Sequence, residues 1–285
     1  MEPTEPVPIS FDHRRRRFLE ALGGLAAIIP AAVLQRHHAD VDFPFRQDSD
    51  FWYLTGCDEP GAVALLLPHR PETPFVLFVP AKDPLAEVWD GFRWGTEGAV
   101  RQFGADLAHP IVDLDSLLPG YLEGAEGLCF RVGRHPHLEP LVLRTWAEQL
   151  DRAPRRGGGA DRLVAPCPLL HAMRLVKDPG ELERMRLAAA ISAAAHERAR
   201  ALVRPGLNEA DVRAELEHHF LASGTRGFAY PSIVAGGDNA CILHYTANNA
   251  PLRDGDLLLI DAGCSLDDHY NGDITRTFQI GRAHV

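Results

Sequence analysis

The sequence predicts two domains, an α/β domain followed by an α+β domain, and its 285 residues are enough for both. From about residue 10 to residue 170, helical and strand-like patterns alternate, which is typical of α/β layers. After residue 177, two helical stretches come first and several strand-like stretches follow, which is typical of an α+β domain. Among those last stretches, Asp261 closes one apolar run and Asp273 opens the next.

The basic segment at residues 13–32, HRRRRFLEALGGLAAIIPAA, admits two interpretations. An arginine cluster followed by a small-residue apolar stretch is typical of a twin-arginine export signal. The alternative is a first amphipathic helix, because Phe18, Leu22 and Leu25 fall on one helical face before two glycines and a short strand. No linker of a mature protein follows the segment, which favours the helix and strand.

Short apolar runs bounded by proline and glycine mark the strands of the first domain. Residues 61–68, GAVALLLP, and residues 74–80, PFVLFVP, predict two central strands. Residues 97–104 and 139–150 have helical patterns. This alternation predicts an α/β layer structure.

The second domain is predicted to begin with two helices. Proline suits the first turn of a helix, so the Lys-Asp-Pro at residues 177–179 opens a long helix, which Arg-Pro-Gly at 204–206 ends. Asn208 is a good N-cap for a second helix that runs to about Leu221. The strand-like segments that follow are PSIVAGG, CILHY, DLLLIDAG and DITRTFQI.

Composition excludes several classes of protein. The net charge of −10 argues against a nucleic-acid or anionic-membrane partner. The five cysteines include no Cys-x-x-Cys pair, so zinc-ribbon and thioredoxin sites are excluded and free thiols in a reducing cytoplasm are expected. No apolar run reaches the roughly 18 residues of a membrane span.

Asp261 and Asp273 are the most informative residues of the chain. A carboxylate that closes an apolar strand is costly unless its charge is compensated. Two of them on neighbouring strands repel each other unless a cation lies between them. All-oxygen ligands of this kind suit hard cations such as Mn²⁺ or Mg²⁺. The alternative is that both aspartates are ordinary turn residues.

His244 lies between Leu243 and Tyr245 in a segment that is predicted to be a strand. A lone strand histidine is usually structural. Facing a metal centre, it could instead donate a hydrogen bond to a substrate carbonyl or to a developing oxyanion.

Three segments together, ILHYTANN, LRDGDLLLIDAG and YNGDITRTF, closely resemble the catalytic domain of aminopeptidase P, the Xaa-Pro aminopeptidases of the pita-bread metallopeptidases. Residues 42–67, DFPFRQDSDFWYLTGCDEPGAVALLL, and 86–95, AEVWDGFRWG, resemble the amino-terminal domain of the creatinase/aminopeptidase P type. HAMRLVKDPGELERMR resembles the linker and first catalytic-domain helix. The resemblance implies an amino-terminal domain at 1–172, the first half of a pita-bread domain at 173–279 and a non-native tail at 280–285.

The resemblance also implies roles for five side chains. Asp261 would ligate one metal ion, and Asp273 would bridge two, both Mn²⁺. His244 would contact the substrate near the scissile carbonyl, and Tyr230 would lie near the active site. Trp89 matches a tryptophan that reaches a neighbouring subunit's site in family oligomers. For the two aromatic residues, the alternative is ordinary core packing.

The implied activity is metal-assisted release of the first residue from peptides with proline at the second position. The implied enzyme is a cytoplasmic homodimer or homotetramer that binds proline-containing peptides and neither nucleic acid nor membrane. The family's other metal ligands, a histidine and two glutamates, would follow Phe278. We therefore expect this chain to be a fragment that is inactive alone, with IGRAHV as foreign sequence.

Two other functions remain open at this stage. A prolidase-type Xaa-Pro dipeptidase shares the fold and the metal-binding aspartates, although FPFRQDSDFWYLTG and ILHYTANN favour the aminopeptidase. A metal-free pita-bread binding module is the other, and the presence of both Asp261 and Asp273 argues against it.

Overall fold

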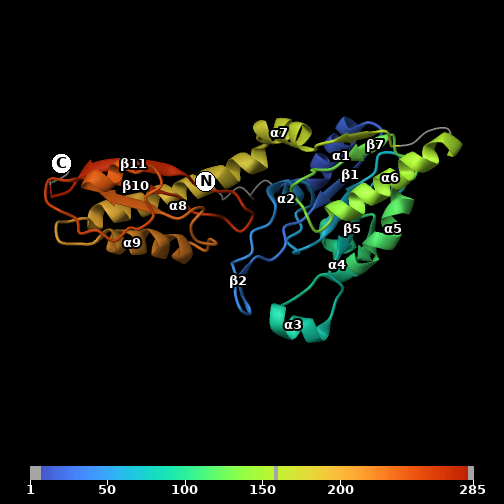
Figure 1. Ribbon diagram of the computed structural model, residues 1–285. Helices are drawn as coiled ribbons and strands as arrows, with labels where there is room; N and C mark the ends of the chain where they lie inside the picture. The colour runs from blue at the N-terminus through green and yellow to red at the C-terminus, as the bar shows by residue number, and fades with distance from the viewer. Residues whose placement is uncertain (1–7, 157–159, 282–285) are drawn as a thin grey trace, which may run out of the picture. The chain divides into compact units, whose positions relative to one another are not determined.

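The computed structural model describes residues 8–156 and 160–281. Contacts divide the chain into two compact units, an N-terminal unit at Ser10–Val176 and a C-terminal unit from Lys177 onward. Figure 1 labels the elements of both units. The domain limits inferred from the resemblance, which place the first boundary after residue 172, stay a prediction.

The N-terminal unit is built on a six-stranded mixed sheet in the order β6-β5-β4-β1-β7-β8. Strand β1 pairs antiparallel with β4 on one side and parallel with β7 on the other. The elements of this unit are α1 (Phe11–Leu22), β1 (Leu25–Pro30), β2 (Arg36–His38), β3 (Val41–Asp42), α2 (Ser49–Thr55), β4 (Val63–Leu66), β5 (Phe75–Val79), α3 (Pro84–Asp90), α4 (Gly95–Phe103), β6 (Leu107–Pro110), α5 (Leu114–Tyr121), β7 (Gly127–Cys129), α6 (Glu139–Arg156), β8 (Arg162–Val164) and α7 (Cys167–Leu175).

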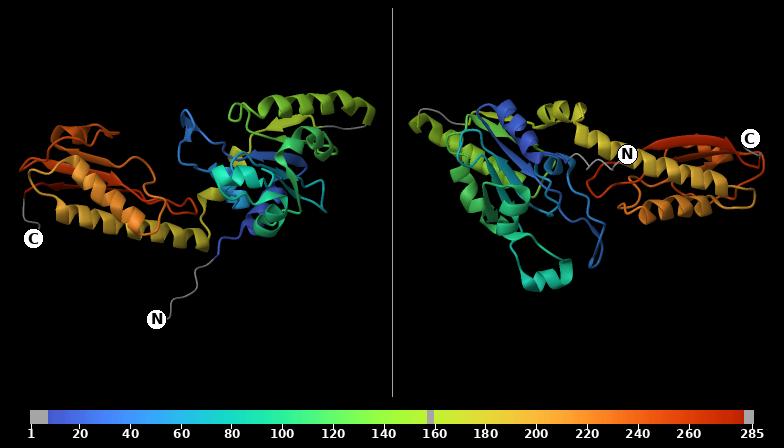
Figure 2. Two further views of the ribbon diagram at one scale, coloured as in Figure 1. Left: turned by 90° about the horizontal axis from the view of Figure 1, so that it is seen from below. Right: turned by 180° about the vertical axis from the view of Figure 1, so that it is seen from behind.

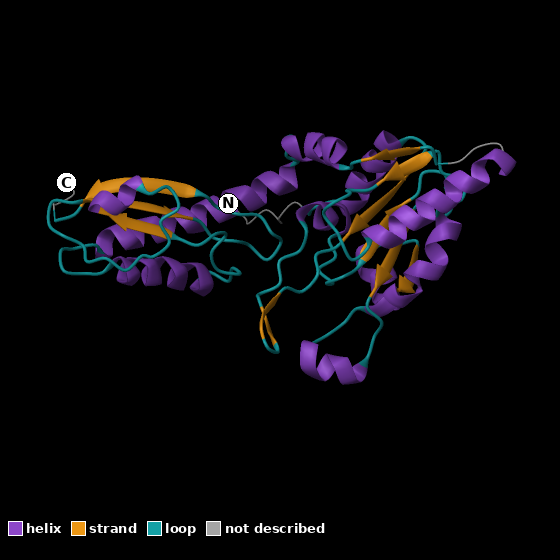
Figure 3. Ribbon diagram, in the orientation of Figure 1, coloured by secondary structure: helices purple, strands orange, loops and turns teal. Residues whose placement is uncertain are grey.

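Helices cover both faces of this sheet, as Figure 3 shows. Successive strand residues point to opposite faces, so Ala27 and Ile29 join one core cluster while Ala26 and Ile28 join the other. The first cluster includes side chains from α1, α2 and α7, and the second includes side chains from α5 and α6. The predicted α/β layer structure is confirmed.

Residues 11–30 form a helix and a central strand, as the second interpretation of this basic segment predicted. The guanidinium of Arg14 stacks 4.2 Å from the ring centroid of Tyr53, and that of Arg15 stacks 4.3 Å from that of Phe75. Both arginines are buried. Stacked, buried guanidinium groups stabilise the packing of α1 through cation–π attraction.

The C-terminal unit has two helices packed on one face of a three-stranded antiparallel sheet in the order β11-β10-β9 (Figure 2). Both helices begin with a capping box, in which Asp178 and Asn208 accept hydrogen bonds from the first turns. This is the predicted α+β order. The elements are α8 (Pro179–Leu202), α9 (Glu209–Ala222), β9 (Ile233–Gly236), β10 (Leu257–Ala262) and β11 (Ile274–Gln279).

Alternation of side chains along β10 decides on which face of the sheet the Asp261 side chain lies. Leu258, Ile260 and Ala262 are buried against the helices. Asp261 has the opposite parity, so its side chain lies on the face of the sheet that the helices leave uncovered.

The strand predicted at CILHY is wrong. A 3₁₀ turn spans Gly237–Cys241, and His244 follows in an exposed turn rather than in a strand. Leu243 beside it is 89% exposed. The apolar pattern misled because this segment takes its hydrogen bonds from buried polar side chains and not from a neighbouring strand.

Of the predicted tail, residues 282–285 lie outside the described residues. Ile280 is buried, and its N–H donates to the Asp256 carbonyl at 2.8 Å. Each of the five cysteines, all within the described ranges, is free. Among the described helices, none combines the length and the apolarity that crossing a membrane requires.

Candidate metal centre

The carboxylates of Asp261 and Asp273 converge on one hydroxyl group. The Tyr230 hydroxyl lies 2.5 Å from Oδ1 of Asp261 and 2.9 Å from Oδ1 of Asp273. Asp261 lies within β10, and Asp273 directly precedes β11. The two residues that we predicted to approach each other are thus joined through a third residue.

Two glycines bring the ends of these strands close together. A side chain at Gly263 would place its Cβ 1.9 Å from the carbonyl oxygen of Gly272. One at Gly272 would place its Cβ 2.1 Å from Oγ of Ser192 on α8. The Gly272 N–H also donates to the Cys264 carbonyl at 2.8 Å. The Asp-Ala-Gly and Asn-Gly-Asp segments therefore need glycine because backbone meets backbone there.

Burial raises the pKa of Tyr230, and its hydrogen bonds to Asp261 and Asp273 raise it further. The phenol therefore keeps its proton at neutral pH and can donate it to a carboxylate. Two carboxylates that converge from neighbouring strands, with no nitrogen or sulfur donor among the residues that bridge them, fit a hard divalent cation.

His196, which the sequence did not single out, supports the strand behind Asp261. It is buried on α8, and its Nε2 lies 3.1 Å from the carbonyl oxygen of Ala262. Burial lowers the pKa of His196. The imidazole is therefore neutral at pH 7, and its Nε2–H donates to that carbonyl. Nothing in its sequence context distinguishes His196 from a surface histidine on a helix.

Glu209, which sequence reasoning also missed, holds the segment that carries His244. Its buried carboxylate accepts hydrogen bonds from the N–H of Gly236 at 2.8 Å and from the N–H of Ala250 at 2.9 Å. It also accepts from Nδ2 of Asn239 at 3.1 Å and from the hydroxyl of Tyr245 at 2.8 Å. One carboxylate thus ties both ends and the middle of the segment.

Asn248 gives this segment a second attachment. Its Oδ1 accepts from the Val234 N–H at 2.7 Å, and its Nδ2 donates to the Ser232 carbonyl at 2.7 Å. The imidazole of His244 itself is exposed. Within the described residues, no hydrogen bond or ion pair joins His244 to Asp261 or Asp273.

Trp89, the remaining predicted site residue, belongs to the N-terminal unit. It lies on α3 and is 88% exposed. Leu85, Val88 and Phe92 beside it are exposed as well. The alternative interpretation of Trp89 as a core residue is therefore wrong.

Two family models match the chain. Residues 11–129 match the aminopeptidase P N-terminal domain, and residues 183–285 match metallopeptidase family M24. The chain is 39% identical over 278 residues to the Xaa-Pro aminopeptidase of Escherichia coli and covers 62% of that protein. It is 38% identical over 271 residues to the Xaa-Pro aminopeptidase of Haemophilus influenzae and covers 60% of it. The chain thus spans less than two thirds of the length of these relatives.

Solved structures agree with this match. Pseudomonas aeruginosa aminopeptidase PepP aligns with a TM-score of 0.90 and 44% identity, over 97% of this chain and 63% of that one. Zinc-substituted E. coli aminopeptidase P in complex with product aligns with a TM-score of 0.90 and 37% identity, over 96% of this chain and 63% of that one. With both family models matched in their expected order, the chain belongs to the aminopeptidase P group of the M24 metallopeptidases.

Proposed function

We propose that this chain supplies part of a metal-dependent aminopeptidase that releases the first residue of peptides with proline in second position. The observation that carries the proposal is the convergence of the Asp261 and Asp273 carboxylates on Tyr230. The names of the most similar relatives, Xaa-Pro aminopeptidases, support the substrate class.

In this proposal Asp261 and Asp273 hold divalent cations, and two Mn²⁺ ions are the set that the family resemblance implies. Bound metal of this kind polarises a carbonyl and activates water. The Tyr230 phenol, which stays protonated, keeps the two carboxylates oriented toward each other. His244 projects an exposed imidazole from a segment fixed by Glu209, so it can donate a hydrogen bond to the carbonyl of a bound peptide.

The exposed apolar side chains of α3 support an oligomer of this chain. Leu85, Val88 and Trp89 are each about four-fifths or more exposed on a single short helix. We propose that α3 contacts a second copy, in a dimer or a tetramer, and that Trp89 takes part in that copy's peptide site. The proposed compartment is the cytoplasm, where five free cysteines stay reduced.

Hydrolysis of a tripeptide with proline second, by the full-length gene product with added Mn²⁺, tests the proposal. Asp261→Asn and Asp273→Asn should each reduce turnover by at least a thousandfold, since each removes a carboxylate ligand. Asp267→Asn is the matched control, because its side chain is 81% exposed in the same connection between strands. Unchanged turnover in both variants would overturn the proposal.

The same assay separates the prolidase alternative. A prolidase-type enzyme cleaves an Xaa-Pro dipeptide faster than the tripeptide, whereas an aminopeptidase shows the reverse preference. A metal-free binding module would bind the peptide without cleaving it and would not respond to Mn²⁺. The two converging carboxylates favour a metal-dependent enzyme over this module.

A further inference from the structure

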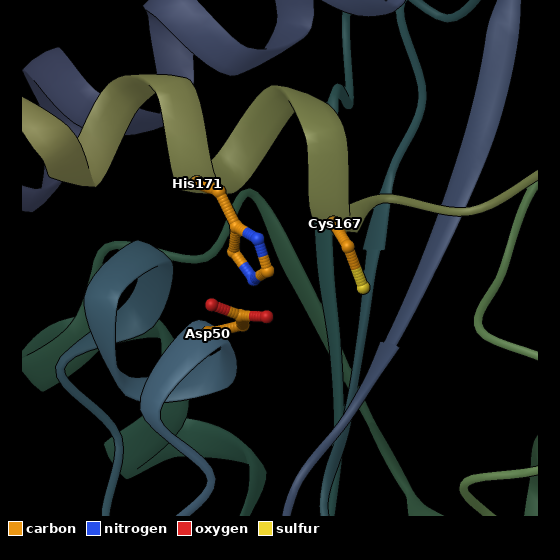
Figure 4. A group of neighbouring side chains, drawn as sticks. All are labelled: Asp50, Cys167 and His171. Carbon is orange, nitrogen blue, oxygen red and sulfur yellow. The ribbon is translucent and has the colours of Figure 1, made fainter.

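A second group of metal-ligating side chains lies in the N-terminal unit. One carboxylate oxygen of Asp50, the Sγ of Cys167 and one ring nitrogen of His171 all lie within 4.8 Å of one another. Figure 4 shows the three side chains directed into the space between α7 and α2. We propose that Asp50, Cys167 and His171 bind a zinc-type divalent cation, independently of Asp261 and Asp273.

The fold places these three side chains together for identifiable reasons. Cys167 and His171 are four residues apart on α7 and therefore share one face of the helix. Leu170 and Met173, on the adjoining face of α7, are buried in the core. The face with the two ligands is thus fixed, because turning the helix would expose the apolar residues.

Helix α2, which carries Asp50, is held firmly against this region. The Asp48 side chain caps α2 by accepting hydrogen bonds from the N–H groups of Asp50 and Phe51, at 2.9 and 3.1 Å. The hydroxyl of Tyr53 donates to the carbonyl of Met173 on α7 at 3.4 Å. The two helices that supply the ligands are therefore connected directly to each other.

The donor set selects a cation of a different kind from the Asp261–Asp273 pair. Thiolate, imidazole and carboxylate together are typical zinc ligands, whereas Mn²⁺ and Mg²⁺ prefer oxygen alone. The negative charges of Asp50 and Cys167 balance one divalent cation, and His171 binds as a neutral imidazole.

The distances require only small adjustments. Zinc–ligand bonds of about 2.0–2.3 Å place the donors of a tetrahedral site about 3.3–3.8 Å apart. Donors that already lie within 4.8 Å reach that spacing by side-chain rotation.

Arg174 orients the carboxylate of Asp50 by a hydrogen bond to one of its two oxygens. Its Nη1 donates to Oδ1 of Asp50 at 2.5 Å, and the Asp50 side chain is only 13% exposed. The other oxygen stays available for a cation. Partners of this kind, which hold a ligand from behind, are a regular feature of metal sites.

A cavity also reaches two of the three proposed ligands. Asp50, His171 and Arg174 line a cavity of about 770 Å³, whose other lining residues include Arg131 and Arg134. Water from this cavity can complete a tetrahedron with the three protein ligands, and the cation can enter by the same route. Arginines beside the site repel a cation, so binding depends on the negative charges of the two anionic ligands, Asp50 and Cys167.

Cobalt titration of the whole chain, kept reduced by a phosphine, tests this proposal. Co²⁺ replaces zinc and gives a near-ultraviolet thiolate charge-transfer band only where a cysteine is a ligand. The carboxylates of Asp261 and Asp273 contain no sulfur, so cobalt bound there does not contribute to the band. We expect the band to saturate as cobalt is added and to disappear when Zn²⁺ is added.

The variants identify the ligands. Cys167→Ser should abolish the band, and His171→Ala should weaken cobalt binding by more than the roughly 10–100-fold that is typical of changes behind a ligand. Cys241→Ser, which removes an exposed cysteine in the C-terminal unit, should leave the band unchanged. Absence of the band in the unaltered chain, or a band that survives Cys167→Ser, would overturn the proposal. Circular dichroism confirms that each variant is folded.

Discussion

Replacing the buried Glu209 tests how the segment at residues 236–250 is held. This carboxylate accepts four hydrogen bonds, two from backbone N–H groups and two from the side chains of Asn239 and Tyr245. Each carboxylate oxygen takes two of them.

The size of the effect follows from the groups that lose their acceptor. A buried donor left without a partner costs about 1–3 kcal/mol. Glu209→Ala removes the acceptor of two backbone N–H groups, so we expect a loss of about 3–5 kcal/mol in the free energy of unfolding. Glu209→Gln keeps one carbonyl oxygen but turns an amide NH₂ toward two of the donors. We expect it to cost about 2 kcal/mol.

Urea unfolding of the chain, followed by circular dichroism, measures these losses. Glu215→Gln is the control, because Glu215 lies on the same helix in an exposed ion pair with Arg198, whose loss costs at most about 1 kcal/mol. In the full-length gene product, the conservative Glu209→Gln should also lower kcat/KM, because His244 loses its fixed position. If Glu209→Ala and Glu215→Gln unfold at the same urea concentration, the four hydrogen bonds that Glu209 accepts do not stabilise the segment.

Three further changes test other parts of the structure. Gly263→Ala should destabilise the C-terminal unit by about 3 kcal/mol in urea unfolding, because its Cβ meets the Gly272 backbone at 1.9 Å. Gly120→Ala, which lies in helix α5 with nothing within 4 Å of its Cβ, should not destabilise the chain. Because burial lowers the pKa of His196, the unfolded chain takes up a proton first as the pH falls, so this contribution to the free energy of unfolding is complete above about pH 6.5 and declines below it. His196→Gln should therefore flatten the acid side of a stability–pH curve by at most about 1.4 kcal/mol per pH unit, and an unchanged slope would refute the assignment. Trp89→Ala should leave the melting temperature unchanged, because the side chain is 88% exposed, but should shift sedimentation of the full-length gene product toward the monomer; an unshifted oligomer contradicts the proposed role of α3.

Local patterns were sufficient to predict several of the regular elements of the chain. Residues 63–66 and 75–79 are strands because apolar side chains occupy both faces of a buried sheet, which leaves a continuous apolar run in the sequence. Asn208 predicted the start of α9 because its side chain accepts a hydrogen bond from the first turn, an interaction contained within three residues. Where the stabilising contact is local, sequence identifies it.

The segment around His244 shows where this reasoning fails. Ile242, Leu243 and Tyr245 give it the composition of a strand, but no strand pairs with it among the described residues. Its conformation depends on Glu209 and Asn248, whose hydrogen bonds reach across many residues of sequence. Such long-range hydrogen bonds cannot be predicted from a glutamate at the start of a helix or from an asparagine in a loop.

The Asp261–Asp273 pair combines both situations. The sequence predicted that Asp261 and Asp273 belong to neighbouring strands, whereas the register that places Asp261 opposite Thr275 is known only from the structure. The Tyr230 hydroxyl between the carboxylates depends on a loop that crosses from another part of the unit, and only the family resemblance pointed to that residue.

The Tyr230 contact also explains why the pair is suited to a cation. A phenol that keeps its proton provides one hydrogen for two carboxylates, so it orients them without neutralising either. The two carboxylates converge on the uncovered face of the sheet, where two negative charges would repel each other. In the proposed function, a divalent cation would offset that repulsion, and the close approach of Gly263 and Gly272 holds the ends of the two strands together.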